Sequence, residues 1–129
     1  MNESTERVEI FLPPTDAKLN AHNKGHWRSK LQAVNKRRAY ARLMTRSAMN
    51  KFNILEKWKR ASLSYRFFVP NNIQRDRVNM MQQEKASVDG VVDAGLIVGD
   101  HWQVLEIVSC EVIIRKLNPG TVLIFKRLE

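Results

Sequence analysis

The segment from Trp27 to Lys51 does most to limit what this chain can form. It consists mainly of Lys, Arg, Ala, Leu, Met and Gln, which are all good helix formers. Five of its apolar residues are spaced so that they share one helix face: Leu31, Val34, Ala41, Met44 and Ala48. We therefore expect one long helix here, with its apolar side packed against the rest of the protein.

Strand-like segments precede and follow this helix. Arg7–Leu12 places Val8, Ile10 and Leu12 on one face and is stopped by two prolines. Ala61–Val69 is rich in aromatic and β-branched residues, and the turn residues that follow it end the strand. The first half of the chain therefore predicts a strand, a long helix and a second strand.

A second helix is expected from about Asn79, a plausible N-cap, to about Ala94. Gly95 stands where many helices end in a left-handed residue. The segment Val104–Lys116 is rich in Val and Ile, and the turn at 118–120 separates it from Thr121–Arg127. These last two segments predict an antiparallel hairpin. Its first strand offers five residues for burial: Leu105, Ile107, Cys110, Val112 and Ile114.

The order β, α, β, α, β, β predicts an α/β (α+β) fold, with a mixed sheet of about four strands and two main helices, as a single domain over residues 1–129. A single cysteine, Cys110, excludes an intramolecular disulfide and a Cys-based zinc cluster. It suits a reducing cytosol, and with no signal-peptide pattern or membrane-span pattern we expect a cytoplasmic protein without a membrane partner. Phosphate-binding loop and dinucleotide motifs are absent, so no nucleotide cofactor is expected.

Charge is the first functional signal, because the chain carries a formal net charge of +9. No Asp or Glu occurs between Ala17 and Leu55. The same segment holds ten positive residues: Lys18, Lys24, Arg28, Lys30, Lys36, Arg37, Arg38, Arg42, Arg46 and Lys51. These charges repel one another unless something negative comes close, which favours a polyanionic partner. A solvated helix face is the alternative.

Four residues around the second predicted helix form a candidate site. Asp76 precedes the helix, Lys85 and Asp89 lie on one face of it at i,i+4 spacing, and Asp100 follows it. Asp76 and Asp100 can meet only if the chain folds back, and surface salt bridges are the alternative interpretation of these residues.

The stretch RDRVN at 75–79, Lys85, and VDGVVDAGLIVGDHW at 88–102 together resemble the core signature of RusA-type Holliday junction resolvases. Members known from bacteria and their phages carry an R-D-x-D-N motif, a lysine on the following helix, a D-G-L…A-G segment and an acidic pair in a loop. Leu19-Asn20 and His26-Trp27-Arg28, shortly after Pro13-Pro14, are similar to the N-terminal pattern of the family. The resemblance covers most of the chain.

The resemblance implies an endonuclease dependent on Mg²⁺ (or Mn²⁺) that resolves four-way (Holliday) junctions in DNA recombination and repair, acting as a homodimer on branched DNA. Asp76 and Asp100 match metal-binding and catalytic aspartates of the family, and Lys85 matches its helical lysine, which would stabilise charge on the phosphate. Val78 and Gly99 depart from the pattern, since the family has acidic residues at both places. A metal ligand is thereby lost, which leaves open a protein that binds branched DNA without cutting it.

Three nearby groups could compensate for the missing carboxylates: Asp89, Glu84 and His101. The residues expected to contact DNA are Lys24, Arg28, Lys30, Lys36, Arg37, Arg38, Arg42, Arg75 and Arg77. Trp27 and Trp102 could each stack on an exposed base or lie in the core, whereas Trp58 is expected to be buried. A small repressor or RNA-binding protein is a third possibility, although no helix-turn-helix or RNP-type strand motif is evident.

Overall fold

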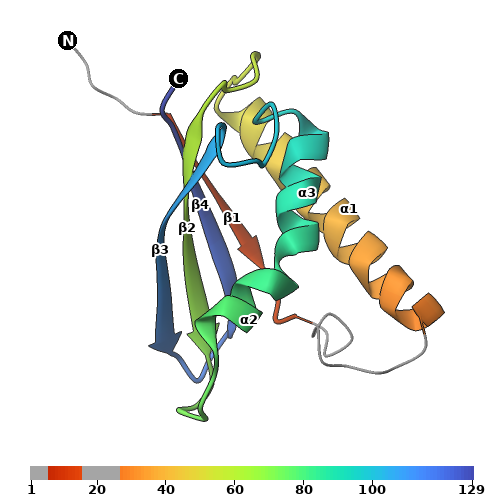
Figure 1. Ribbon diagram of the computed structural model, residues 1–129, viewed down its shortest axis with the longest axis vertical. Coiled ribbons are helices and arrows are strands. Elements are labelled where there is room, and N and C mark those ends of the chain that lie inside the picture. Colours follow the sequence, from red (N-terminus) through yellow and green to blue (C-terminus); the bar gives the residue numbers. More distant parts are fainter. Residues whose placement is uncertain (1–5, 16–26) are drawn as a thin grey trace.

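The computed structural model describes residues 6–15 and 27–129, which form a four-stranded mixed sheet with three helices on one of its faces (Figure 1). In chain order the elements are β1 (Arg7–Leu12), α1 (Trp27–Lys51), β2 (Ala61–Val69), α2 (Arg77–Gln83), α3 (Lys85–Ala94), β3 (Leu105–Ile114) and β4 (Gly120–Arg127). The mixed α+β class predicted from the sequence is confirmed.

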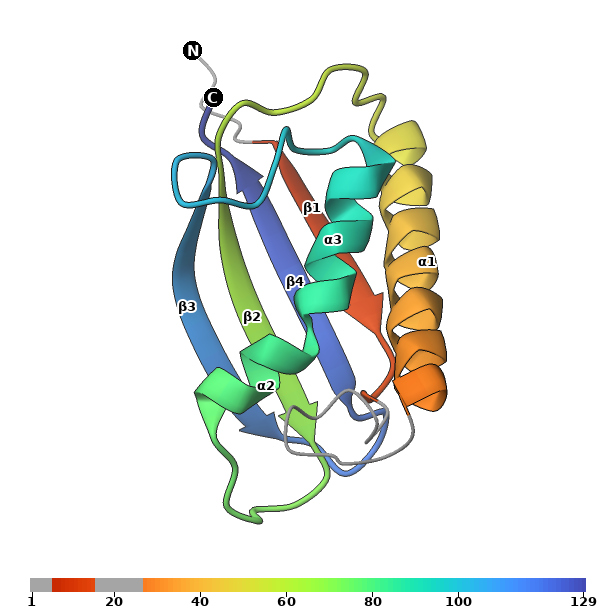
Figure 2. The same ribbon diagram turned by 45° about the vertical axis from the view of Figure 1, so that its right-hand side comes forward.

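The strands lie in the order β1-β4-β2-β3. β4 is antiparallel to both of its neighbours, while β2 and β3 run parallel. Parallel neighbours need a crossover connection, and α2 and α3 supply it. In the view of Figure 2, α2 crosses in front of β2 and α3 lies in front of β4, while α1 lies beside α3 and contacts β1.

The core lies between the sheet and the helices. β1 alternates between exposed and buried residues, and its buried residues Val8, Ile10 and Leu12 face this layer. Trp58, in the segment between α1 and β2, is fully buried as expected, and its backbone pairs with Leu96 and Val98 beyond α3. No helix in the described part of the chain combines the length and apolar composition of a membrane span.

The predicted bounds of β1, α1 and β2 are confirmed, and so is the left-handed end of the second helical region, where Gly95 has φ of 92°. The predicted start of that region is wrong. Asp76, rather than Asn79, is the N-cap, and the region is interrupted at Glu84 into two helices. At this break the Glu84 side chain is fully buried and pairs with Arg37 of α1.

The predicted hairpin of the last two strands is also wrong, because β2 lies between β3 and β4. β4 buries residues on both of its faces, among them Leu123, Ile124 and Phe125, and such a strand belongs in the interior of a sheet. β3 is an edge strand of the sheet instead. Of the five residues expected to be buried there, only Leu105 is, while Ile107 and Ile114 are each 58% exposed.

The buried side of α1 differs in part from the expected one. Ala41 is buried, but Leu31 and Met44 are exposed, and the remaining fully packed positions are Arg37, Thr45 and Met49. α1 is therefore turned so that a basic residue, Arg37, enters the interior. The partner that makes this possible comes from the break between α2 and α3.

α1 and α3 approach closely at Gly90. A Cβ atom at this position would lie 2.3 Å from the backbone oxygen of Arg38 and 3.0 Å from the Cβ of Ala41. Backbone cannot yield as the end of a side chain can, so only glycine allows the two helices to pack at this separation.

Gly90→Ala is expected to destabilise the fold. The better helix propensity of alanine contributes about 1 kcal/mol, but overpacking costs about 1–3 kcal/mol or more, and here the obstacle is backbone. Thermal or urea unfolding measures the difference. Gly99→Ala is the matched control, because its new Cβ would meet only the exposed His101 ring, at 3.3 Å. Equal stability of the two variants would contradict the close approach.

Candidate functional site

Lys85 joins two carboxylates that are distant in sequence. Its Nζ donates to Asp89 Oδ1 at 2.8 Å, one helical turn along α3, and also to Asp100 Oδ2 in the loop before β3. Lys85 is the first residue of α3, and the left-handed Gly95 turns the chain back after α3. The chain therefore folds back so that Asp100 reaches Lys85, a contact that sequence spacing alone could not establish.

The charges of this trio stabilise one another. The hydrogen bonds that Lys85 donates to Asp100 and then to Asp89 raise the pKa of Lys85, and the bond donated to Asp100 lowers the pKa of that carboxyl. Lys85 stays an ammonium and Asp100 a carboxylate across the neutral range. The contribution of the pair to stability is complete between the two ordinary pKa values, roughly 4 and 10. It is lost as pH falls through the lowered pKa of Asp100 or rises through the raised pKa of Lys85.

A groove of about 540 Å³ opens beside the trio, between α2, α3 and the edge strand β3. Its lining combines apolar and polar side chains: Tyr65, Val78, Met81, Gln82, Lys85, Val88, Asp100, Leu105 and Ile107. Burial raises the pKa of Tyr65 to about 12, so its hydroxyl keeps its proton. Val78, the residue in place of an expected aspartate, thus lines the same groove as Lys85 and Asp100. Tyr65 and Met81 were not anticipated, since residues on β2 and α2 show no sequence signal for a shared groove.

Asp76 is not among the residues that line this groove. Its Oδ1 accepts a hydrogen bond from the backbone N–H of Val78 at 2.9 Å and so caps α2. The residue lines a separate depression with Thr15, Asn79 and Gln83. The seven residues of α2, which rise roughly 10 Å, separate Asp76 from Lys85 in the chain.

Helical spacing explains why the two aspartates lie in different depressions. Positions 78, 81, 82 and 85 recur every three to four residues and face the groove, whereas 79, 80 and 83 line the depression of Asp76. Position 78, and not 76, is the one from which a carboxylate would enter the groove of Lys85 and Asp100.

Glu84 does not supply a substitute for the missing carboxylate. Glu84 is fully buried in an ion pair with Arg37, whose Nη2 donates to Glu84 Oε2 at 2.7 Å and whose Nε donates to Oε1 at 3.2 Å. The Ser87 hydroxyl donates to Glu84 Oε1 at 2.6 Å, and Arg37 Nη1 donates to the backbone oxygen of Pro13 at 2.7 Å. His101 is exposed beside Asp100 and is not part of the groove lining.

The residues expected to contact DNA fall into several groups. The expectation that Arg37 contacts DNA is corrected. Its side chain is buried and pairs with Glu84, so it cannot reach a phosphate. Arg38 donates to both carboxylate oxygens of Asp93 on α3, at 2.5 and 2.8 Å, which lowers the pKa of Asp93. Arg75 donates to the backbone oxygens of Asn71 and Ile73 within the loop before α2.

The remaining members of that set lie mainly at the surface. Arg28, Lys36, Arg42 and Arg77 are exposed and Lys30 is half-buried, while Lys24 lies outside the described residues. Acidic residues of the α2–α3 region thus neutralise part of the basic helix, which sequence patterning could not foresee. The two tryptophans left open by the sequence are both exposed, Trp27 by 64% and Trp102 by 84%.

The donors for a metal ion are limited. Among residues 6–15 and 27–129, no three His, Cys, Asp or Glu side chains are grouped closely enough to hold one. Two carboxylates, Asp89 and Asp100, do converge on a single point, the Nζ of Lys85. Such a pair fits Mg²⁺, which proteins commonly hold by one or two carboxylates together with substrate phosphates.

No family model matches the sequence, and no curated protein matches it. The interpretation of the site therefore rests on its own residues and geometry.

Breaking the buried ion pair is expected to destabilise the protein. Glu84→Leu leaves a guanidinium without its counterion, which costs about 3–5 kcal/mol, whereas Arg37→Met/Glu84→Leu should cost much less than the sum of the single changes. Urea unfolding of the four proteins measures this coupling. Arg38→Met is the control, because its partner Asp93 is exposed and such pairs contribute about 0–1 kcal/mol. Additive effects at Arg37 and Glu84 would contradict the network.

Asp100→Asn is expected to lower the pKa of Lys85 toward its ordinary value, because the largest cause of the upward shift is removed while Asp89 remains. Titration of the lysine side-chain NMR signals measures the change. Asp93→Asn is the matched control on the same helix, since Asp93 pairs with Arg38. An unchanged Lys85 titration in Asp100→Asn would show that the two groups do not interact in solution.

Proposed function

We propose that this chain is a RusA-like, Mg²⁺-dependent endonuclease that cuts four-way DNA junctions as a homodimer. The observation that carries the proposal is the meeting of Asp89 and Asp100 at the Nζ of Lys85, beside an open groove that Lys85 and Asp100 line, although Asp100 lies 15 residues from Lys85 in sequence. A lysine between two carboxylates, on a protein with net charge +9, suits the hydrolysis of a phosphodiester. A two-fold symmetric dimer would place one such site on each of two strands.

Asp89 and Asp100 would hold the metal ion in this proposal. Bound Mg²⁺ supplies polarisation of the phosphate and stabilisation of the leaving oxygen. Lys85 now occupies the point between the two carboxylates, and with a raised pKa it keeps its positive charge. Its side chain is 64% exposed, so it can swing toward a phosphate oxygen and stabilise charge there. Exposed Arg28, Lys36, Arg42 and Arg77 would bind the backbone of the DNA arms.

A specific observation favours a second candidate, a protein that binds branched DNA without cutting it. Val78 is 58% exposed and lines the groove where a third carboxylate would stand. Loss of one metal ligand or one transition-state contact commonly costs about 100-fold or more in rate. Binding through phosphate contacts would survive such a loss.

Incubation with a synthetic four-way junction and Mg²⁺ tests the nuclease. Paired nicks are expected, and Asp100→Asn should slow them by about 100-fold or more while binding persists. Asp93→Asn, an acidic residue on α3 outside the groove, is the control and should cut at the normal rate. Binding without any cutting contradicts the nuclease, and equal affinity for linear duplex and junction contradicts both candidates.

Val78→Asp tests the second candidate. If Val78 is what prevents cutting, the new carboxylate should create or raise Mg²⁺-dependent nicking by about 100-fold. Val78→Asn is the matched control, since it changes polarity and shape similarly without adding charge. Full activity of the unsubstituted protein rules the second candidate out, whereas no gain in Val78→Asp contradicts only the assignment of the lost cutting to Val78.

A further inference from the structure

Trp102 is presented to solvent close to the candidate site. Its side chain is 84% exposed, in contrast to fully buried Trp58. The turn that carries it is fixed, because the backbone oxygen of His101 accepts from the N–H groups of Val104 and Leu105, each at 2.9 Å. The N–H of Ala61 then donates to the oxygen of Val104 at 2.9 Å, which ties the turn to β2. The exposed ring therefore projects from a turn whose backbone is ordered by hydrogen bonds.

The surface around Trp102 continues into the groove of Lys85. A depression of about 900 Å³ is lined by Arg60, Asp100, Trp102, Gln103, Leu105, Glu106 and Ile107. Asp100, Leu105 and Ile107 also line the groove that holds Lys85 and Val78. The aromatic ring and the lysine–aspartate pair thus belong to one continuous surface.

The chemistry of this depression fits a nucleobase. A base has a flat π-face that stacks on an indole, and an edge of hydrogen-bond donors and acceptors. Gln103, Glu106 and Arg60 offer polar groups for such an edge. A lipid or an apolar peptide would instead require a lining dominated by aliphatic side chains, and here charged and amide groups alternate with them.

We propose that Trp102 stacks on an unpaired base at the branch point and so positions the adjoining phosphate at Lys85 and Asp100. This inference rests on the proposed function, because it names how that same site selects its strand. It assigns Trp102 a positioning role: the ring touches the base, and the effect on cutting acts through placement of the strand. The fixed turn lowers the entropy lost on binding, since the ring is already outward before DNA arrives.

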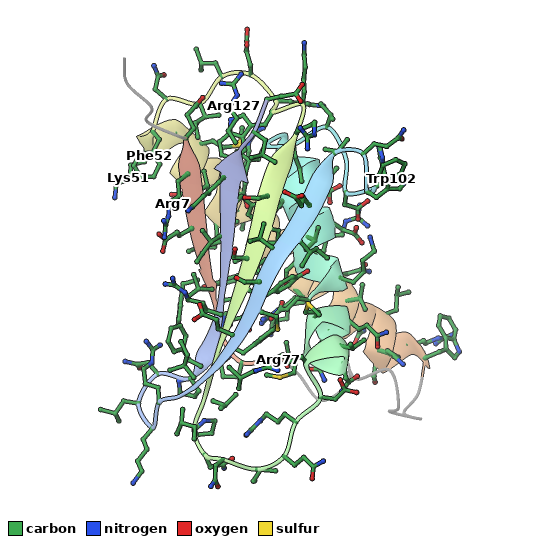
Figure 3. The ribbon with its side chains drawn as sticks, turned by 60° about the vertical axis from the view of Figure 1, so that its left-hand side comes forward. Arg7, Lys51, Phe52, Arg77, Trp102 and Arg127 are labelled. Carbon is green, nitrogen blue, oxygen red and sulfur yellow. The ribbon has the colours of Figure 1, made fainter. Side chains whose placement is uncertain are left out.

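Figure 3 shows a natural control. Phe52 is also an exposed aromatic residue, but it lies beside the edge strand β1. Trp102 lies beyond β3, at the opposite edge of the sheet. Phe52 is far from the groove and stands next to Lys51, whose Nζ lies 5.6 Å from the centre of its ring.

Junction affinity tests the inference. Trp102→Ala should weaken binding by roughly 5- to 150-fold, the range for loss of one stacked base, Trp102→Phe should restore most of it, and Phe52→Ala should leave it unchanged. Because Trp102 is exposed, its loss should not change the unfolding midpoint. Unaltered affinity in Trp102→Ala, or equal weakening in Phe52→Ala, overturns the proposal.

A second readout separates this inference from the proposed function. In a Trp27→Phe background, the exposed tryptophan emission comes from Trp102, and a short oligothymidylate should quench it. Quenching together with no preference for junction over linear duplex would support stacking while contradicting the junction nuclease. Absence of quenching, with junction cutting intact, would overturn stacking alone.

Discussion

The buried ion pair between Arg37 and Glu84 is the interaction on which the arrangement of the helices depends. It connects the middle of α1, the break between α2 and α3, and the chain just after β1 through the oxygen of Pro13. A buried pair of this kind stabilises little by itself, because desolvation opposes the attraction, but either charge alone would be very unfavourable. The pair therefore disfavours arrangements that would bury either charge alone, and it holds the Arg37 side of α1 against Glu84.

This constraint also arranges the candidate site. With Glu84 directed into the interior, α3 begins anew at Lys85, and Lys85 reaches Asp89 and Asp100 at the surface. α2 carries two different faces toward two depressions, so the motif residues at 76 and 78 are divided between them. Valine stands at position 78, where the resolvase pattern has an acidic residue, and this difference changes the groove of Lys85 directly. Asp76 instead acts on α2 as its cap.

Local patterns in the sequence predicted much of the fold. Alternation and helix-forming composition located β1, α1 and β2, and Gly95 was recognised because a left-handed helix end depends on one residue. Predictions that required non-local knowledge failed. The turn at 118–120 suggested a hairpin, yet β4 pairs with β1 and β2, and acid-free composition did not reveal that Glu84 and Asp93 come to α1 from elsewhere. At the site, i,i+4 spacing predicted the contact of Lys85 with Asp89, while the contact with Asp100 needed the three-dimensional turn.

The strand order has a consequence for how the protein is made. β4 is the last element in the chain, yet it lies between β1 and β2 and pairs with both along their lengths. β1 therefore has no strand to pair with until nearly the whole domain has been synthesised. Its pairing with β4 joins residues more than a hundred positions apart. Sheets closed by such distant contacts form slowly, so the first strand stays unpaired and open to aggregation until β4 has been synthesised.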